Sequence, residues 1–73
     1  MALDSLTHLD AAMLDLEHQW WPTAGQKENA IRDQLGMTPT RYYQRLTRLT
    51  DTEAALAHDP VLVNRLRRLR SRP

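Results

Sequence analysis

The sequence predicts an all-α fold, a compact four- to five-helix domain that contains a helix-turn-helix at about residues 24–50. Two observations support this expectation. Apolar residues recur at steps of three and four along much of the chain, which is the period of an amphipathic helix. The runs are preceded by Thr or Asp, residues that cap helix N-termini. Since 73 residues suffice for one small domain, we take residues 1–73 as a single helical domain.

The first helix is predicted to begin after Thr7, because Asp10 follows three residues later at the spacing of a capping box. Its apolar seam is Leu6, Leu9, Met13, Leu16 and Trp20. So short a seam favours core packing over a dimer contact, and we expect Trp20 in the core. Trp21 lies off the seam and precedes Pro22, which ends the helix, so its indole is predicted to be a lid over the core or a partly exposed contact.

The turn residues of the helix-turn-helix stand at the expected places. Its first helix begins after Thr23 and ends before Gly36, a residue that accepts a positive φ. Thr38 can cap the second helix, and Pro39 suits its first turn. The small pair at 24–25 permits close approach, and we expect a tryptophan to pack there rather than a phosphate to bind.

The second helix of the pair has one apolar and one basic side. Its apolar stripe is Tyr42, Leu46 and Leu49, expected to face Ile31, Leu35 and Met37. Its other side is Thr40, Arg41, Tyr43, Gln44, Arg45, Thr47 and Arg48. That side holds arginine but no acid; Arg pairs with guanine through two donors, Gln with adenine, and hydroxyls reach phosphates. A dozen helical residues span about 18 Å and fit the DNA major groove. The alternative is a solvated helix face.

Charge is distributed unevenly along the chain, although the net charge is only +1. Residues 1–35 carry six acidic and two basic side chains, whereas residues 36–73 carry eight arginines and three acidic side chains. A basic face of this kind is what a polyanion meets. Nine of the ten basic residues are Arg, a bias that a GC-rich genome also produces. This bias weakens the inference that the arginines contact a polyanion, but it does not explain why eight of them lie in residues 36–73.

The C-terminal third is predicted to hold two more helices. Thr50 with Glu53 has capping-box spacing and begins a short helix that contributes Ala55 and Leu56 to the core. Asp59 followed by proline begins a basic helix at about 60–71. Its apolar side is Leu62, Leu66 and Leu69, and its arginines occupy most of the remaining arc. Those arginines are predicted to contact phosphates; the alternative is a solvated tail that keeps the protein soluble.

Catalytic and metal-binding patterns are missing from the sequence. The three histidines fall on different predicted elements and none has the HExxH spacing, while His18 lies three residues from Asp15, at the distance of a surface hydrogen bond. We therefore expect no enzyme activity and no cofactor or metal. The chain has no cysteine and no apolar run of about 18 residues, and its first basic residue is Lys27. We expect a soluble cytoplasmic protein with no membrane partner.

Several stretches together resemble a known family: WW at 20–21, AG at 24–25, KE at 27–28, AIR at 30–32, GM at 36–37, TRYYQ at 40–44 and DPVLVNRLRRLR at 59–70. On these residues the chain is similar to an actinobacterial family of small proteins, also found in actinophages, that is described only as a domain of unknown function. The resemblance covers nearly the whole chain. It implies a compact helical protein of a high-GC bacterium or its virus, and it brings no catalytic residues.

A looser similarity concerns the DNA-reading helix pairs of winged-helix and sigma-factor proteins, in which a turn of the form LGxSxxxVxxxL is common. The corresponding residues are Leu35, Gly36, Met37, Thr38, Tyr42 and Leu46. Tyr42 is bulky for the crossing point, so either the helices cross slightly apart or Tyr42 fills the space and sends its hydroxyl to the surface. No strands suitable for a wing follow, which disfavours the winged form.

We expect a helix-turn-helix DNA-binding protein, a small transcription regulator whose partner is double-stranded DNA and which gains specificity as a homodimer or in a larger complex. The predicted DNA-binding residues are Thr40, Arg41, Tyr43, Gln44, Arg45 and Arg48 at bases and nearby phosphates, with Lys27, Arg65, Arg68 and Arg72 on the backbone. The alternative is an adaptor that docks its basic face or Trp21 on RNA polymerase, a sigma factor or another regulator. RNA binding is less favoured, because the apolar spacing buries Tyr42.

Overall fold

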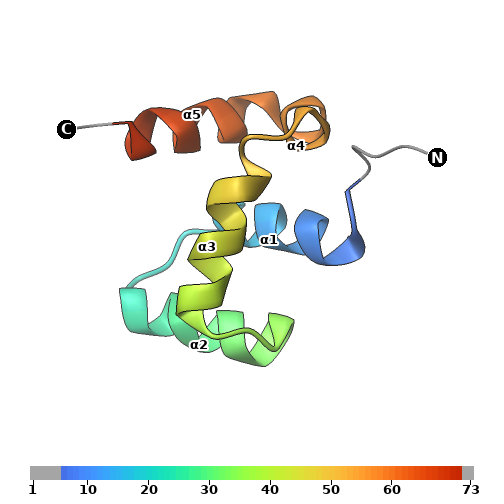
Figure 1. Cartoon of the computed structure of the whole chain (residues 1–73). Helices are drawn as coiled ribbons and strands as arrows, with labels where there is room; N and C mark the ends of the chain where they lie inside the picture. Colours follow the sequence, from blue (N-terminus) through green and yellow to red (C-terminus); the bar gives the residue numbers. More distant parts are fainter. Residues whose placement is uncertain (1–5, 72–73) are drawn as a thin grey trace.

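The computed structural model describes residues 6–71, which form five α-helices. The helices are α1 (His8–His18), α2 (Ala24–Leu35), α3 (Pro39–Leu49), α4 (Glu53–His58) and α5 (Pro60–Arg70). Figure 1 shows α3 running between α2 at one end of the molecule and the α4–α5 pair at the other. Helix α1 packs against α2, α3 and α5, and α2 also packs against α3. The central position of α3 leaves one of its faces for solvent. The all-α prediction is confirmed.

The helix starts follow from local capping chemistry. Thr7 and Asp10 form the predicted capping box of α1, and Thr23 and Thr38 accept the backbone N–H groups that α2 and α3 leave unsatisfied. Asp59 does the same for α5. The prediction that Thr50 caps α4 is wrong, because Thr52 accepts the N–H of Ala55, while Thr50 ends α3.

The connection from α2 to α3 consists of residues 36–38. Gly36 has φ 65°, in the left-handed region, and its N–H donates to the Arg32 carbonyl at 3.1 Å. The Met37 N–H donates to the Ile31 carbonyl at 3.4 Å, so the last carbonyls of α2 are satisfied by a Schellman-type end. This turn sets α3 against α2 within three residues.

All five helices contribute residues to the core. Its fully or nearly fully buried residues are Met13, Leu14, Leu16, Ala30, Ile31, Tyr42, Leu46, Leu49, Ala55, Leu62 and Val63. The predicted stripe of α3 is confirmed, and Leu35, Met37, Leu56 and Leu66 are partly buried and pack against the core as a whole. Leu14 and Val63 are core residues that the spacing did not predict. They are buried because α1 meets three other helices and α5 packs on both α4 and α1, so each needs more than one narrow apolar seam.

Two predicted core residues are in fact exposed. Trp20 is 83% exposed, because α1 ends at His18 and Gln19 adopts an extended conformation that takes the chain off the helical path. Trp21 takes the inward place instead: it packs against the core and its indole N–H donates to the Leu16 carbonyl at 3.2 Å. Its role as a lid is confirmed. Leu69 is 54% exposed near the end of α5, beyond the buried residues of that helix.

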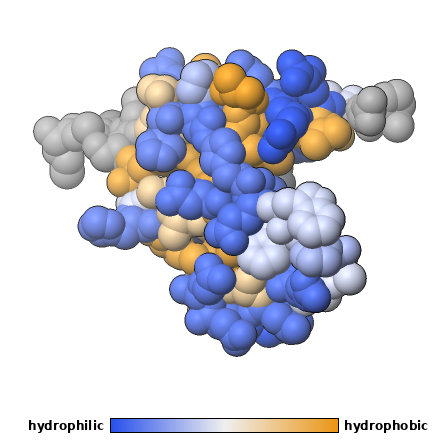
Figure 2. All heavy atoms as spheres, turned by 180° about the vertical axis from the view of Figure 1, so that it is seen from behind, coloured by the Kyte–Doolittle hydropathy of each residue, from blue (hydrophilic) through white to orange (hydrophobic). Residues whose placement is uncertain are grey.

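On the face that Figure 2 shows, the exposed hydrophobic side chains of residues 6–71 do not merge into one surface. On α5 they are Val61 and Leu69. Figure 2, which shows the molecule from behind, has its largest orange areas toward the α4–α5 end, and blue hydrophilic groups separate them. Scattered exposed apolar residues are ordinary on a small protein. This face therefore does not by itself indicate a large apolar partner.

The two glycines provide a matched test of the fold. Gly36→Ala should lower the free energy of unfolding by about 1–2 kcal/mol, because it forces a side chain into the left-handed region. Gly25→Ala should instead raise it by about 0.4–1 kcal/mol, because the backbone there is helical. A Cβ on Gly25 would meet Thr23 Oγ1 at 3.9 Å and no tryptophan, so the expected packing of a tryptophan is not found at the Cβ position of Gly25.

Thermal or urea unfolding of both variants measures the difference. Equal changes of the same sign would contradict the assigned conformations.

Candidate nucleic-acid interface

One face of α3 gathers basic side chains around a hollow of about 330 Å³. Its lining consists of Met37, Arg41, Gln44, Arg45 and Arg48. The four residues from α3 recur at steps of three and one, so they share one side of the helix. Arg41, Gln44 and Arg48 are exposed. Among the residues that the structure describes, no carboxylate lines this hollow, so the side chains of its lining carry positive charge only.

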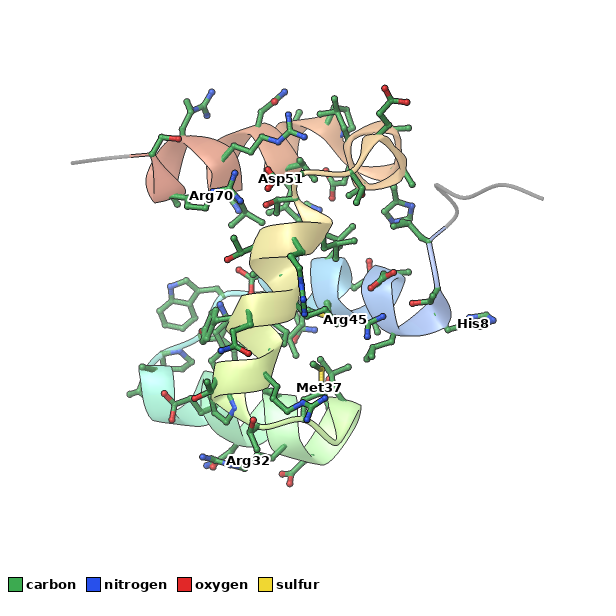
Figure 3. The ribbon with its side chains drawn as sticks, in the orientation of Figure 1. His8, Arg32, Met37, Arg45, Asp51 and Arg70 are labelled. Carbon is green, nitrogen blue, oxygen red and sulfur yellow. The ribbon has the colours of Figure 1, made fainter. Side chains whose placement is uncertain are left out.

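Arg41 and Arg48 differ from Arg45 in their surroundings. Neither takes part in an ion pair within residues 6–71. Arg45 bonds to Asp10 of α1 through Nε and Nη2, each 3.0 Å from the same carboxylate oxygen. Its side chain is 39% exposed and that of Asp10 is 15% exposed. Figure 3 places Arg45 where α3 passes α1. The hollow thus contains two arginines facing solvent and one that is held in place.

Asp10 is ionised in this setting. Its partial burial acts to raise the pKa, but hydrogen bonds from the Thr7 N–H and from Arg45 outweigh it, and the pKa of Asp10 lies below its usual range. The same carboxylate therefore caps α1 and binds α3. Its spacing from Thr7 predicted the first of these roles but not the second.

Behind the basic face, Tyr42 is fully buried and anchors α3 to α1. Its hydroxyl hydrogen bonds to the carboxylate of Glu17, and lies 3.3 Å from the carbonyl oxygen of Met13. Burial raises the pKa of Tyr42, and the adjacent Glu17 raises it further, so the phenol stays protonated. Tyr42 is buried, as its place in the apolar stripe predicted, but its hydroxyl points to α1, so the expectation that it reaches the surface is wrong.

Lys27 belongs to this support and not to the exposed basic face. Its Nζ lies 2.8 Å from Glu17 Oε2, and 6.0 and 5.3 Å from the ring centroids of Tyr42 and Tyr43. Partial burial acts to lower the pKa of Lys27, but the bond to Glu17 outweighs it and raises the pKa. The side chain is 19% exposed. We therefore leave Lys27 out of the candidate interface.

Tyr43 and Thr40 are exposed but do not line the basic hollow. Tyr43 stacks edge-on against Tyr42, with ring centroids 5.0 Å apart. It lines a second, mainly apolar hollow of about 180 Å³ that also includes Leu46 and Leu66. Tyr43 thus lies toward α5, away from the arginine set with which it was predicted to act.

The arginines of α5 are divided between two roles. Arg67 Nε donates to the Thr50 carbonyl at 2.6 Å, and Arg70 bonds to the Thr47 carbonyl at 2.9 Å and to Asp51 at 2.7 Å. Figure 3 shows Arg70 and Asp51 beside one another between α5 and the end of α3. Both arginines thus satisfy carbonyls at the C-terminus of α3, where positive charge is favourable.

The other basic residues of this region remain available. Arg65 and Arg68 are exposed and take part in no ion pair within residues 6–71. The predicted contact of Arg72 lies outside the described residues. Sequence reasoning missed the structural task of Arg67 and Arg70, although their spacing of three places them on one side of the helix.

His18 bonds to the carboxylate of Asp59, the cap of α5, and not to Asp15 as predicted. This hydrogen bond lowers the pKa of Asp59.

Within residues 6–71 there is no group of three or more side chains that could hold a metal ion. Among the same residues, no helix has the length and apolar character needed to cross a membrane.

Comparison with known proteins identifies a family for this chain. The model of a family described as a protein of unknown function (DUF3263) matches residues 5–72. No curated protein and no solved structure matches the chain. The match agrees with the resemblance to an uncharacterised family.

The anchor of α3 can be tested by removing one hydroxyl. Tyr42→Phe leaves the Glu17 side chain, which is 8% exposed, with Lys27 but without its phenol donor. The free energy of unfolding should fall by about 1–3 kcal/mol, because a largely buried charged group loses a hydrogen bond. Urea denaturation measures this loss. The control is Tyr43→Phe, whose side chain is partly exposed and which should change stability by less than about 0.5 kcal/mol. Losses of equal size would show that the Glu17 bond is not an anchor.

Proposed function

The chain belongs to the DUF3263 family of proteins of unknown function, and we propose that it is a DNA-binding protein of the helix-turn-helix type, a small transcription regulator. In this proposal α2, the turn at 36–38 and α3 form the motif, and α3 is the helix that enters the major groove. The supporting observation is the hollow on α3, which combines three arginines with one glutamine and has no carboxylate in its described lining.

The dimensions of α3 suit this role. Its 11 residues extend about 16 Å, and a major groove about 12 Å wide admits one helix with its side chains. Gln44 stands between the arginines and can pair with adenine, while Arg41 and Arg48 reach phosphates or guanines. Thr40 is exposed in the first turn of α3, at the end of the helix that commonly meets bases or the backbone. Arg65 and Arg68 supply further positive charge on α5.

One copy of so short a helix reads few base pairs. Specific recognition by such motifs ordinarily uses two copies on half-sites one helical turn apart. We therefore propose that the protein acts on DNA as a homodimer or with another transcription protein, in the cytoplasm of a bacterial cell.

A protein-binding adaptor is the second candidate, and the exposure of Trp20 favours it. Exposed tryptophan is a frequent anchor of protein interfaces. The expected contact Trp21 packs on the core, so Trp20 would take its place in this alternative. The partner would be an acidic surface of RNA polymerase, a sigma factor or another regulator, which the same arginines would meet.

Titration of labelled duplex DNA at two salt concentrations tests the proposal. If about four phosphates are contacted, affinity should fall about 100-fold between about 50 and about 200 mM monovalent salt, because bound counterions are released. Arg41→Ala and Arg48→Ala should each weaken binding and, where a phosphate contact is lost, reduce the slope against log salt by about 1.

Arg32→Ala is the matched control, since Arg32 is also an exposed arginine but lies on α2, outside the hollow. It should have a smaller effect, and Trp20→Ala should leave DNA affinity unchanged. Feeble binding that none of these substitutions alters would refute DNA binding and favour the adaptor.

A further inference from the structure

Arg45 differs from the other arginines of the hollow in being fixed before any partner arrives. Of the three, it alone bonds to a carboxylate of the described residues, through two nitrogens 3.0 Å from Asp10 Oδ1. A long 3.5 Å contact joins its Nη2 to Thr7 Oγ1. Because the guanidinium is planar, contacts to Nε and Nη2 fix its orientation as well as its position.

Asp10 is itself held firmly. It is the third residue of α1, and its second carboxylate oxygen accepts the Thr7 N–H at 3.3 Å in the capping box. The Thr7 hydroxyl in turn accepts the Asp10 N–H at 3.0 Å. The carboxylate that positions Arg45 is therefore itself fixed by the capping box at the N-terminus of α1.

This arrangement leaves one edge of the guanidinium for a ligand. Asp10 occupies the edge formed by Nε and Nη2, and Nη1 takes part in none of the bonds within residues 6–71. Arg45 lines the hollow. A ligand that took the edge formed by Nη1 and Nη2 would replace the long 3.5 Å contact of Nη2 with Thr7 Oγ1, which is at the limit of a hydrogen bond. Two parallel N–H donors match the O6 and N7 acceptors that guanine presents in the major groove.

The N-terminus of α1 is an unfavourable place for an Arg45–Asp10 ion pair that serves only stability. Arg45 lies at the N-terminal end of α1, where the helix dipole disfavours a cation, and Asp10 offsets that cost. Partial neutralisation by Asp10 also makes Arg45 a weaker phosphate ligand than Arg41 or Arg48. A fixed, partly neutralised arginine is suited to recognising a base more than to attracting a backbone.

We propose that Asp10 is a positioning residue for DNA recognition: it orients Arg45 to pair with one guanine, while Arg41 and Arg48 supply affinity that is independent of sequence. This inference rests on the proposed function and adds to it the residue that determines specificity. It predicts that the preferred site contains a guanine whose replacement is discriminated through Arg45, and that this discrimination depends on Asp10.

The test uses the full chain and a duplex library with a randomised centre, from which wild-type protein selects its preferred site. Affinities are then measured for that site and for duplexes with each guanine replaced in turn. In the wild type, replacing the guanine read by Arg45 should weaken binding about 10- to 100-fold, the range for a good bidentate contact. Asp10→Asn should reduce this ratio to no more than a few-fold, while binding to the replaced duplex stays equal or becomes tighter.

Asp51→Asn is the matched control. It removes the same charge and also breaks an aspartate–arginine pair, that with Arg70, but at the α5 end of α3 and outside the hollow. It should leave the ratio unchanged. In an Arg45→Ala background, the further change Asp10→Asn should also leave the ratio unchanged, since there is no guanidinium to orient. Circular dichroism and thermal unfolding confirm that each variant is folded at the assay temperature.

Each other outcome has a definite meaning. If Asp10→Asn changes affinity for all duplexes by the same factor, upward or downward, Asp10 acts only through charge or through α1, and the inference is overturned while DNA binding stands. Selection of no preferred sequence by a wild-type protein that binds duplex also overturns the inference alone. Absence of duplex binding by the wild type overturns the proposed function and this inference together.

Discussion

The buried contact of Tyr42 with α1 is the constraint on which the rest of the surface depends. The Tyr42 side chain is fully buried, and its hydroxyl bonds to Glu17 of α1, whose other partner is Lys27 from α2. Three helices are thus joined at one phenol. Because a helix has a fixed angular relation between its residues, burying Tyr42 decides which side chains of α3 point outward. The basic hollow therefore lies on a face of α3 other than the one that carries the buried Tyr42.

The far end of α3 is fixed by a different interaction. Arg67 and Arg70 reach back from α5 to the carbonyls of Thr50 and Thr47, which lie where the helix runs out of internal donors. Helix α5 is therefore oriented by its arginines as well as by Leu62 and Val63. Two of the cations that the sequence offers to a polyanion are used inside the protein, so the count of arginines overstates the charge available at the surface.

Most helix caps were predictable, although Thr52 and not Thr50 caps α4, whereas distant pairings were not predictable. Thr7, Gly36 and Asp59 act as expected because a cap involves residues three or four apart. The bonds that define the candidate site join residues 25 and 35 positions apart, namely Tyr42 to Glu17 and Arg45 to Asp10, and no local spacing reports on such pairs.

The extended conformation of Gln19 after α1 was not predicted either. Because of it, Trp20 is exposed, the reverse of what the apolar spacing predicted, and Trp21 packs against the core. One signal was present in the sequence: an acidic first half and a basic second half can attract each other. The charge asymmetry that suggested an external polyanion also describes pairing within the fold.

The ion pair between Arg45 and Asp10 bears on how the protein would bind DNA in the proposed function. If every arginine of α3 faced solvent without a partner, binding would be governed by phosphate attraction and would discriminate little among sequences. The carboxylate of Asp10 restricts the orientation of Arg45 and partly neutralises its charge. In the proposed function, this pairing would shift the balance from DNA affinity toward sequence selectivity. A protein with so small a basic face cannot compensate by area, since single modules of this size bury little surface. In the proposed function, pairing two copies would restore affinity without loosening the contact that Arg45 is proposed to make with a base.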